Sequence, residues 1–238
     1  IMLAVDVSTS MLAEDLKPNR LEAAKDVAAE FINGRPNDNI GITLFAGESF
    51  TQCPLTVDHA VLLDMIHNIK CGLIEDGTAV GMGIANAVTR LKDSKAKSKV
   101  IILLTDGTNN KGDISPMTAA EIAKSFGIRV YTIGVGTNGM APYPYPVGNT
   151  IQYVSMPVEI DEKTLTQIAG TTDGNYFRAT SNSKLKEVYE EIDKLEKTKL
   201  NVKEYSKREE DYRWFALAAF LCVLLEVLLR NSILKKIP

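Results

Sequence analysis

The run Lys99–Thr105, which reads Lys-Val-Ile-Ile-Leu-Leu-Thr, constrains the fold more than any other stretch. Its apolar residues are unbroken and largely β-branched, which is the pattern of a strand buried on both faces, as in a parallel sheet. Strands of the same kind are predicted at 1–5, 39–45 and 128–135, and a short one at 176–177. Helical periodicity is found between them, in segments at 18–33, 59–69, 80–91, 119–126, 161–169 and 185–195.

This alternation of strands and helices predicts an α/β fold, a doubly wound and mostly parallel sheet with helices on both faces. Residues 49–53 follow the second strand across Gly47 and predict one antiparallel edge strand. The segment 140–157 interrupts the rhythm with four prolines and three tyrosines, and it predicts a surface hairpin or flap. Its tyrosines suit either a partner interface or the packing of a long insertion.

The C-terminal region has a different composition. From Trp214 to Leu229 the only charged residue is Glu226, and the apolar character extends over 212–234. A helix of that length can cross a bilayer, with Tyr212 and Trp214 at one interface, so we expect a transmembrane helix there. The alternative is a buried C-terminal helix. Residues 200–211 are charged and are interpreted as a linker, and basic residues on the two sides of the span balance, so charge does not fix the orientation.

Other features narrow the function classes. The net charge of −3 gives no reason to expect nucleic acid as a partner. There is no P-loop and no G-x-G-x-x-G, which argues against nucleotide binding. Cys53 and Cys71 fit either a disulfide or two buried thiols, of which the buried thiols are favoured, and His59 and His67 are interpreted as partly exposed helix residues. The chain opens with Ile1 inside a strand, so we expect that an N-terminal part of the protein precedes it.

Polar side chains follow the predicted strands where a site is expected. Asp6, Ser8 and Ser10 come directly after the first strand, and Asp106 follows Thr105. Because the carboxyl ends of the central strands of a doubly wound sheet meet at one crevice, these residues should converge with Thr78 from a middle loop. Carboxylate and hydroxyl oxygens suit Mg²⁺, and Mn²⁺ or Ca²⁺ fits the same donors. The predicted metal ligands are therefore Asp6, Ser8, Ser10, Thr78 and Asp106, while Asp76 is expected only to shape its loop.

Such a site points to binding rather than bond cleavage. Three neutral hydroxyls and two aspartates leave an ion incompletely neutralised, so an open position attracts a carboxylate from outside. The sequence predicts a protein-interaction module that is not an enzyme and whose partner offers an acidic residue to the metal.

The pattern Asp-x-Ser-x-Ser, a threonine in a middle loop and Asp-Gly after a later strand resembles the metal-ion-dependent adhesion site (MIDAS) of von Willebrand factor type A (VWA) domains. The resemblance covers residues 1–199. Further stretches resemble the bacterial BatA proteins of aerotolerance operons, namely Met11–Leu21, Phe45–Glu48, Thr51–Thr56 and Lys92–Lys99. This resemblance implies a protein of the bacterial inner membrane, anchored on both sides of a domain on the periplasmic side. It also implies other Bat-type membrane proteins and a MoxR-type AAA+ ATPase as partners, and a role in stress or oxygen tolerance.

Two alternatives stay open. One is a degenerate scaffold with the same fold and no metal. The other is an Mg²⁺-dependent phosphatase with Asp6 as nucleophile, as in haloacid-dehalogenase-like enzymes. Those enzymes have a second acid two residues after the nucleophile, where this chain has Ser8, and a lysine in a clear motif is missing as well.

Overall fold

The computed structural model describes residues 1–137, 139–148 and 150–205, together with 219, 223, 226, 227 and 229. The chain forms two compact units, Ile1–Glu196 and Lys197–Pro238, which are described separately. Most of the predicted membrane helix 212–234 lies outside the described residues, as does the linker beyond Tyr205, and both stay predictions. Within the described residues, no helix is long and apolar enough to cross a membrane.

A six-stranded sheet forms the centre of the first unit, in the order β3-β2-β1-β4-β5-β8. Five strands are parallel to one another. They are β1 (Met2–Asp6), β2 (Ile40–Phe45), β4 (Lys99–Thr105), β5 (Ile128–Val135) and β8 (Tyr176–Ala179). The remaining strand, β3 (Ser49–Thr56), pairs antiparallel with β2 at the edge. The predicted mostly parallel sheet with one antiparallel edge strand is confirmed.

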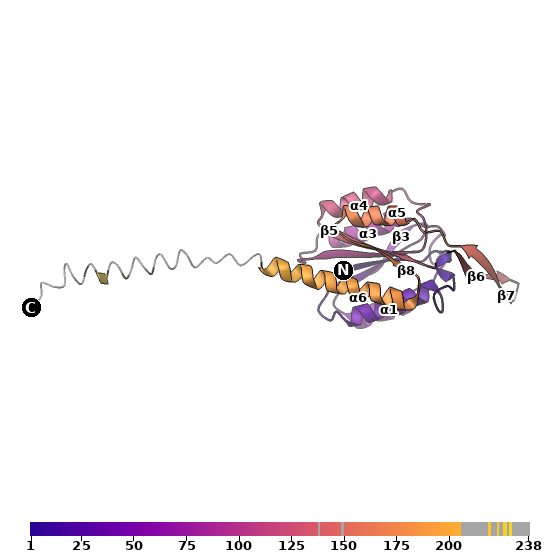
Figure 1. Ribbon diagram of the computed structural model, residues 1–238, viewed down its shortest axis with the longest axis horizontal. Helices are drawn as coiled ribbons and strands as arrows, with labels where there is room; N and C mark the ends of the chain where they lie inside the picture. The colour runs from indigo at the N-terminus through magenta and orange to yellow at the C-terminus, as the bar shows by residue number, and fades with distance from the viewer. Residues whose placement is uncertain are drawn as a thin grey trace, which may run out of the picture. The chain divides into compact units, whose positions relative to one another are not determined.

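Helices cover both faces of this sheet (Figure 1). One face is covered by α1 (Arg20–Asn33), α2 (His59–His67) and the first part of α6 (Asn182–Tyr205), the other by α3 (Val80–Leu91), α4 (Pro116–Ser125) and α5 (Glu162–Thr171). The helices begin where capping side chains allow. The side chain of Asn19 accepts a hydrogen bond from the backbone N–H of Glu22, which places the start of α1 at Arg20 rather than Pro18. Ser115 caps α4 in the same way, so α4 begins three residues before the predicted start.

The order of the strands creates a switch point between β1 and β4. From β1 the chain builds outward through β2 to β3 on one side, and β4, β5 and β8 fill the other side. The neighbouring strands are in register, with Val5 opposite Leu104, so Asp6 and Thr105 end their strands at the same level. Ligand sites in open α/β sheets form at such a point, beyond the carboxyl ends of the strands.

The predicted hairpin at 140–157 is present. The strands β6 (Met140–Val147) and β7 (Thr150–Pro157) form a separate two-stranded antiparallel sheet that extends away from the central sheet (Figure 1). Two contacts to Glu14 hold the hairpin: the backbone N–H of Glu14 donates to the carbonyl of Pro142 at 2.8 Å, and the Tyr153 hydroxyl donates to Glu14 Oε1 at 3.0 Å.

The cysteines Cys53 and Cys71 and the two histidines lie in ordinary packing or surface positions. Cys53 and Cys71 are both free thiols, Cys53 buried and Cys71 only partly buried. His59 and His67 are the first and last residues of α2 and are partly or fully exposed, as expected.

Candidate metal centre

Asp6, the last residue of β1, forms the base of the centre and is completely buried. Its two carboxylate oxygens have different donors. The backbone N–H of Ser8 donates to Oδ1 at 2.9 Å, and the Thr105 hydroxyl donates to Oδ2 at 2.6 Å. Because Thr105 ends the adjacent strand, the register of the sheet itself holds the Asp6 carboxylate in place.

The two serines connect Asp6 to the second carboxylate. Ser8 precedes the 3₁₀ helix η1 (Thr9–Leu12), and this short helix carries Ser10. The hydroxyls of Ser8 and Ser10 are hydrogen-bonded to each other at 2.9 Å, and Ser10 Oγ donates to Asp106 Oδ1 at 2.7 Å. The structure thus places Asp6, Ser8, Ser10 and Asp106 in one continuous network.

Thr78 reaches the same place from the loop before α3. A Cβ atom built on Gly107 would lie 3.3 Å from Thr78 Oγ1, so the threonine hydroxyl packs directly against the turn that follows Asp106. The Asn110 side chain holds this loop by accepting a hydrogen bond from the Thr78 backbone N–H at 2.9 Å. All five residues that the sequence singled out therefore converge on the carboxyl ends of β1 and β4.

Asp76 stays outside this group. Its carboxylate accepts two hydrogen bonds from Thr9, one from the backbone N–H at 3.0 Å and one from the hydroxyl at 2.7 Å. These bonds connect the Gly72–Thr78 loop to η1, which agrees with the expected role of shaping a loop.

Burial makes the ionisation of both carboxylates, Asp6 and Asp106, unfavourable. Burial and then the negative charge of Asp106 raise the pKa of Asp6 to about 7, against the hydrogen bonds from Ser8 and Thr105. Burial also raises the pKa of Asp106, although the charge and hydrogen bond of Arg20 counteract it. A cation bound between the two carboxylates would favour the charged form of both.

Arg20 is the residue that the sequence analysis missed. Its side chain is 4% exposed and lies between two acids, with Nη1 2.6 Å from Asp106 Oδ2 and Nη2 2.7 Å from Asp15 Oδ2. Burial opposes ionisation of Asp15, but hydrogen bonds from Arg20 and from Thr137 outweigh it and lower the pKa of Asp15. A sequence signal did exist: Arg20 is the first residue of α1, and the helix dipole disfavours a cation there.

The donor set suits a hard cation. Within the described part of the chain no group of three His, Cys, Asp or Glu side chains is placed to hold a metal, so an ion at this point would rely on hydroxyl oxygens. Cys71 lies nearby, with its thiol donating to the Ser8 carbonyl at 3.3 Å. Burial and the charges of Asp6 and Asp106 raise the pKa of Cys71 to about 12, which favours the neutral thiol. Oxygen donors of this kind fit Mg²⁺.

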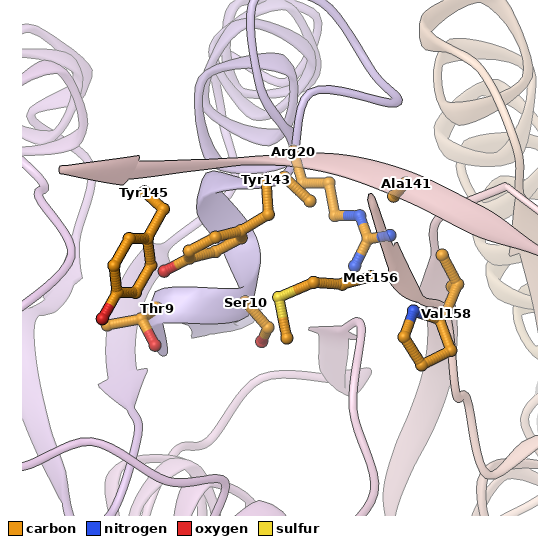
Figure 2. A pocket seen from close by; sticks show the side chains of 10 residues that line it. Thr9, Ser10, Arg20, Ala141, Tyr143, Tyr145, Met156 and Val158 are labelled. Atoms are coloured by element: carbon orange, nitrogen blue, oxygen red, sulfur yellow. The ribbon is translucent and has the colours of Figure 1, made fainter. Parts of the chain in front are cut away.

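A cavity of about 260 Å³ opens beside the centre. It is lined by Thr9, Ser10 and Arg20 and by Tyr143, Tyr145 and Met156 of the hairpin (Figure 2). Ser10 thus belongs to the network of candidate ligands and also faces open space. A group that enters this cavity meets Ser10.

The chain resembles proteins of known structure. Over 82% of its length it matches BatB from Bacteroides thetaiotaomicron, of which it covers 98%, with 34% identity and a TM-score of 0.72. An aerotolerance-related membrane protein from Bacteroides fragilis matches with 34% identity and a TM-score of 0.70 over 81% of this chain and 98% of that one. Proximal thread matrix protein 1 from the mussel byssus, in a form with a zinc-occupied MIDAS motif, matches with 25% identity and a TM-score of 0.62, over 82% of this chain and 44% of that one.

Curated relatives extend beyond this chain. The chain spans 70% of the length of one and 58–59% of the length of several others, which carry the designation UPF0353 protein. The model of the von Willebrand factor type A domain matches residues 1–191, which is most of the chain. With the α/β fold and the convergence of the five residues at its switch point, this match establishes that the chain belongs to the von Willebrand factor type A domain family.

Proposed function

We propose that this chain is a metal-dependent protein-interaction module that binds a divalent cation, Mg²⁺ in the first place, and through it an acidic side chain of a partner protein. The proposed ligands are Asp6, Ser8, Ser10, Thr78 and Asp106. The observation that carries the proposal is the composition of the network: two buried carboxylates that repel each other, joined by neutral hydroxyls, beside an open cavity.

The residues around the centre have separate roles. Thr105 and the Ser8 backbone orient Asp6, and Arg20 holds one oxygen of Asp106 while Ser10 contacts the other. Arg20 already compensates part of the negative charge of Asp106. The protein side chains would therefore neutralise only part of the charge of a bound divalent ion. The ion supplies the positive charge that attracts an outside carboxylate, and such capture forms and breaks no covalent bond.

The likeness to a BatB protein and to an aerotolerance-related membrane protein supports a place in a bacterial envelope complex. We propose that the C-terminal apolar segment 212–234 anchors the chain in the inner membrane, with the domain on the periplasmic side. Other Bat-type membrane proteins and a MoxR-type AAA+ ATPase are the proposed partners, and stress or oxygen tolerance is the proposed context. The zinc-occupied MIDAS motif of the mussel protein supports a divalent ion without specifying magnesium.

One specific observation favours a second candidate, the metal-free scaffold. Arg20 already pairs with Asp106, and Ser8, Ser10 and Asp106 satisfy one another by hydrogen bonds. In that case the network serves stability alone. The phosphatase alternative has less support, because the residue two positions after Asp6 is a serine whose hydroxyl is bonded to Ser10 rather than a second acid.

Calorimetric titration of Mg²⁺ into the 238-residue chain in mild detergent tests the proposal. The variant is Asp6→Asn, which keeps the shape and removes the charge, and the matched control is Asp64→Asn on the exposed side of α2. Saturable binding that disappears only in Asp6→Asn supports a metal site, and acetate as a second titrant then probes carboxylate capture. Absence of binding to the unmodified chain, with and without acetate, would instead favour the scaffold.

A further inference from the structure

The two edges of the β6–β7 hairpin differ in their capacity to accept another strand. In an antiparallel pair, alternate residues bond across the ladder and the residues between them point their N–H and C=O groups outward. Two hydrogen bonds show which residues of the hairpin point outward. The Pro142 carbonyl accepts from Glu14, outside the hairpin, whereas the Val158 N–H donates to Gly139 across the hairpin. Even-numbered positions of β6 therefore point outward, and odd-numbered positions point towards β7.

With this alternation, the outer edge of β6 is a poor partner for another strand. After Met140, the outward positions of β6 are Pro142, Pro144 and Pro146, and proline has no N–H to donate. From Pro142 to the end of the strand this edge has no outward donor, and one of its acceptors is already bonded to Glu14. Alternating prolines are an effective block against strand addition on an edge.

The outer edge of β7 is open. Residues opposite the three prolines are Ser155, Tyr153 and Ile151, so their N–H and C=O groups point away from β6. In the part of the chain that the structure describes, these six groups have no hydrogen-bond partner, and every residue of β7 is exposed. The edge ends at Pro157 and at Val158, whose N–H is already bonded, so the open segment is 151–155 and is centred on Tyr153.

We propose that β7 is a self-association edge that pairs with β7 of a second copy of this chain, antiparallel and about a two-fold axis at Tyr153. In this register Tyr153 lies opposite its own counterpart, and Ile151 lies opposite Ser155 of the other copy. All six open groups of each strand then bond, which joins the two hairpins into one four-stranded sheet. No charged residue occurs from Thr150 to Pro157, so a second copy meets no like charge along this strand.

A second copy fits this edge because antiparallel pairing about Tyr153 uses all three outward residues of each strand and brings no two charged side chains together. The exposed apolar side chains of Ile151, Tyr153, Val154 and Met156 would be partly covered by the pairing. The contact is a single pair of strands, and interfaces of that size associate weakly and reversibly. The residues that would bond, 151–155, do not line the cavity beside the candidate ligands, although Met156 does, and the pairing does not require a metal ion.

Cysteine cross-linking of the 238-residue chain in mild detergent tests the register. Residues opposite each other in a bonded antiparallel pair have Cα atoms about 5.5 Å apart, within the range that a disulfide spans. Tyr153→Cys should therefore give a disulfide-linked dimer with oxidised glutathione. Ser155→Cys is the matched control, because two copies of residue 155 would lie about 13 Å apart in this register. Native cysteines give the same background in both variants.

A several-fold excess of dimer from Tyr153→Cys supports the proposal, and equal dimer from the two variants overturns it. Sedimentation equilibrium supplies the second measurement, without a new cysteine. Tyr153→Pro removes the central outward N–H, whereas Tyr153→Val removes the same ring and keeps that N–H. Weaker self-association of the proline variant alone, with matching circular dichroism spectra, is the expected result. A chain that stays monomeric in every form would show that β7 does not pair with itself.

Discussion

Replacement of Arg20 by methionine separates the two candidate roles of the centre. Arg20 is buried between Asp15 and Asp106 and holds both through charged hydrogen bonds of 2.6–2.7 Å. Removing one partner of a buried ion pair leaves an uncompensated charge and typically costs about 3–5 kcal/mol. For a domain of this size, such a loss lowers the midpoint of thermal unfolding by roughly 6–20 °C.

Magnesium should reverse part of that loss. Without Arg20, Asp106 has lost its only cation partner among the described side chains, so a divalent ion bound there compensates more charge than in the unmodified protein. A ligand at a hundred times its dissociation constant stabilises the folded state by about 2.7 kcal/mol, and tighter binding increases this gain. We therefore expect the Mg²⁺-induced rise in the unfolding midpoint to be larger in Arg20→Met than in the unmodified chain.

The assay is thermal unfolding followed by circular dichroism, in EDTA and in millimolar Mg²⁺. Lys184→Met is the matched control, since it removes a cation from an exposed pair with Glu187 and should change little. The reasoning would be refuted by a loss below about 1 kcal/mol in EDTA, which is the range of an exposed pair. A Mg²⁺ effect no larger in Arg20→Met than in the unmodified chain would favour the metal-free scaffold.

Three further predictions concern pH, packing and the cavity. Because the pKa of Asp6 is raised to about 7, protons compete with the metal ion below that pH. The apparent Mg²⁺ affinity in calorimetry should therefore fall by about tenfold per pH unit below 7 and level off above it. An affinity that is unchanged between pH 8 and pH 6 would contradict this prediction. Gly81→Ala places a Cβ 2.0 Å from the Ile114 carbonyl and should lower the free energy of unfolding by about 1–3 kcal/mol. Gly170→Ala in α5 meets nothing within 4 Å and should raise that free energy by about 0.5–1 kcal/mol, so equal effects in denaturant titrations would refute the packing argument. Met156→Lys places a cation in the cavity wall and should weaken Mg²⁺ binding severalfold by repulsion, whereas Met156→Leu should leave the titration unchanged.

Local sequence patterns determined the elements of this protein. The apolar run Lys99–Thr105 and its shorter counterparts can be satisfied only by burial on both faces, and this requirement alone predicts a parallel sheet covered by helices. The prolines at 142, 144 and 146 likewise marked a segment that cannot join a central sheet. The position of Asp6 and Asp106 directly after two such strands was enough to predict their convergence, since parallel strands share one carboxyl edge.

Tertiary structure decided what surrounds those carboxylates. Arg20 and Asp106 are 86 residues apart in sequence, and Thr105 and Asp6 are 99 apart. The periodicity that indicates a helix or strand acts over a few residues and carries no information about which distant side chain fills a given space. The pairing of Arg20 with Asp106 depends on α1 packing beside the end of β4, which exists only in the assembled sheet. The sequence by itself therefore determined where the candidate ligands lie, and the fold determined which charges they face.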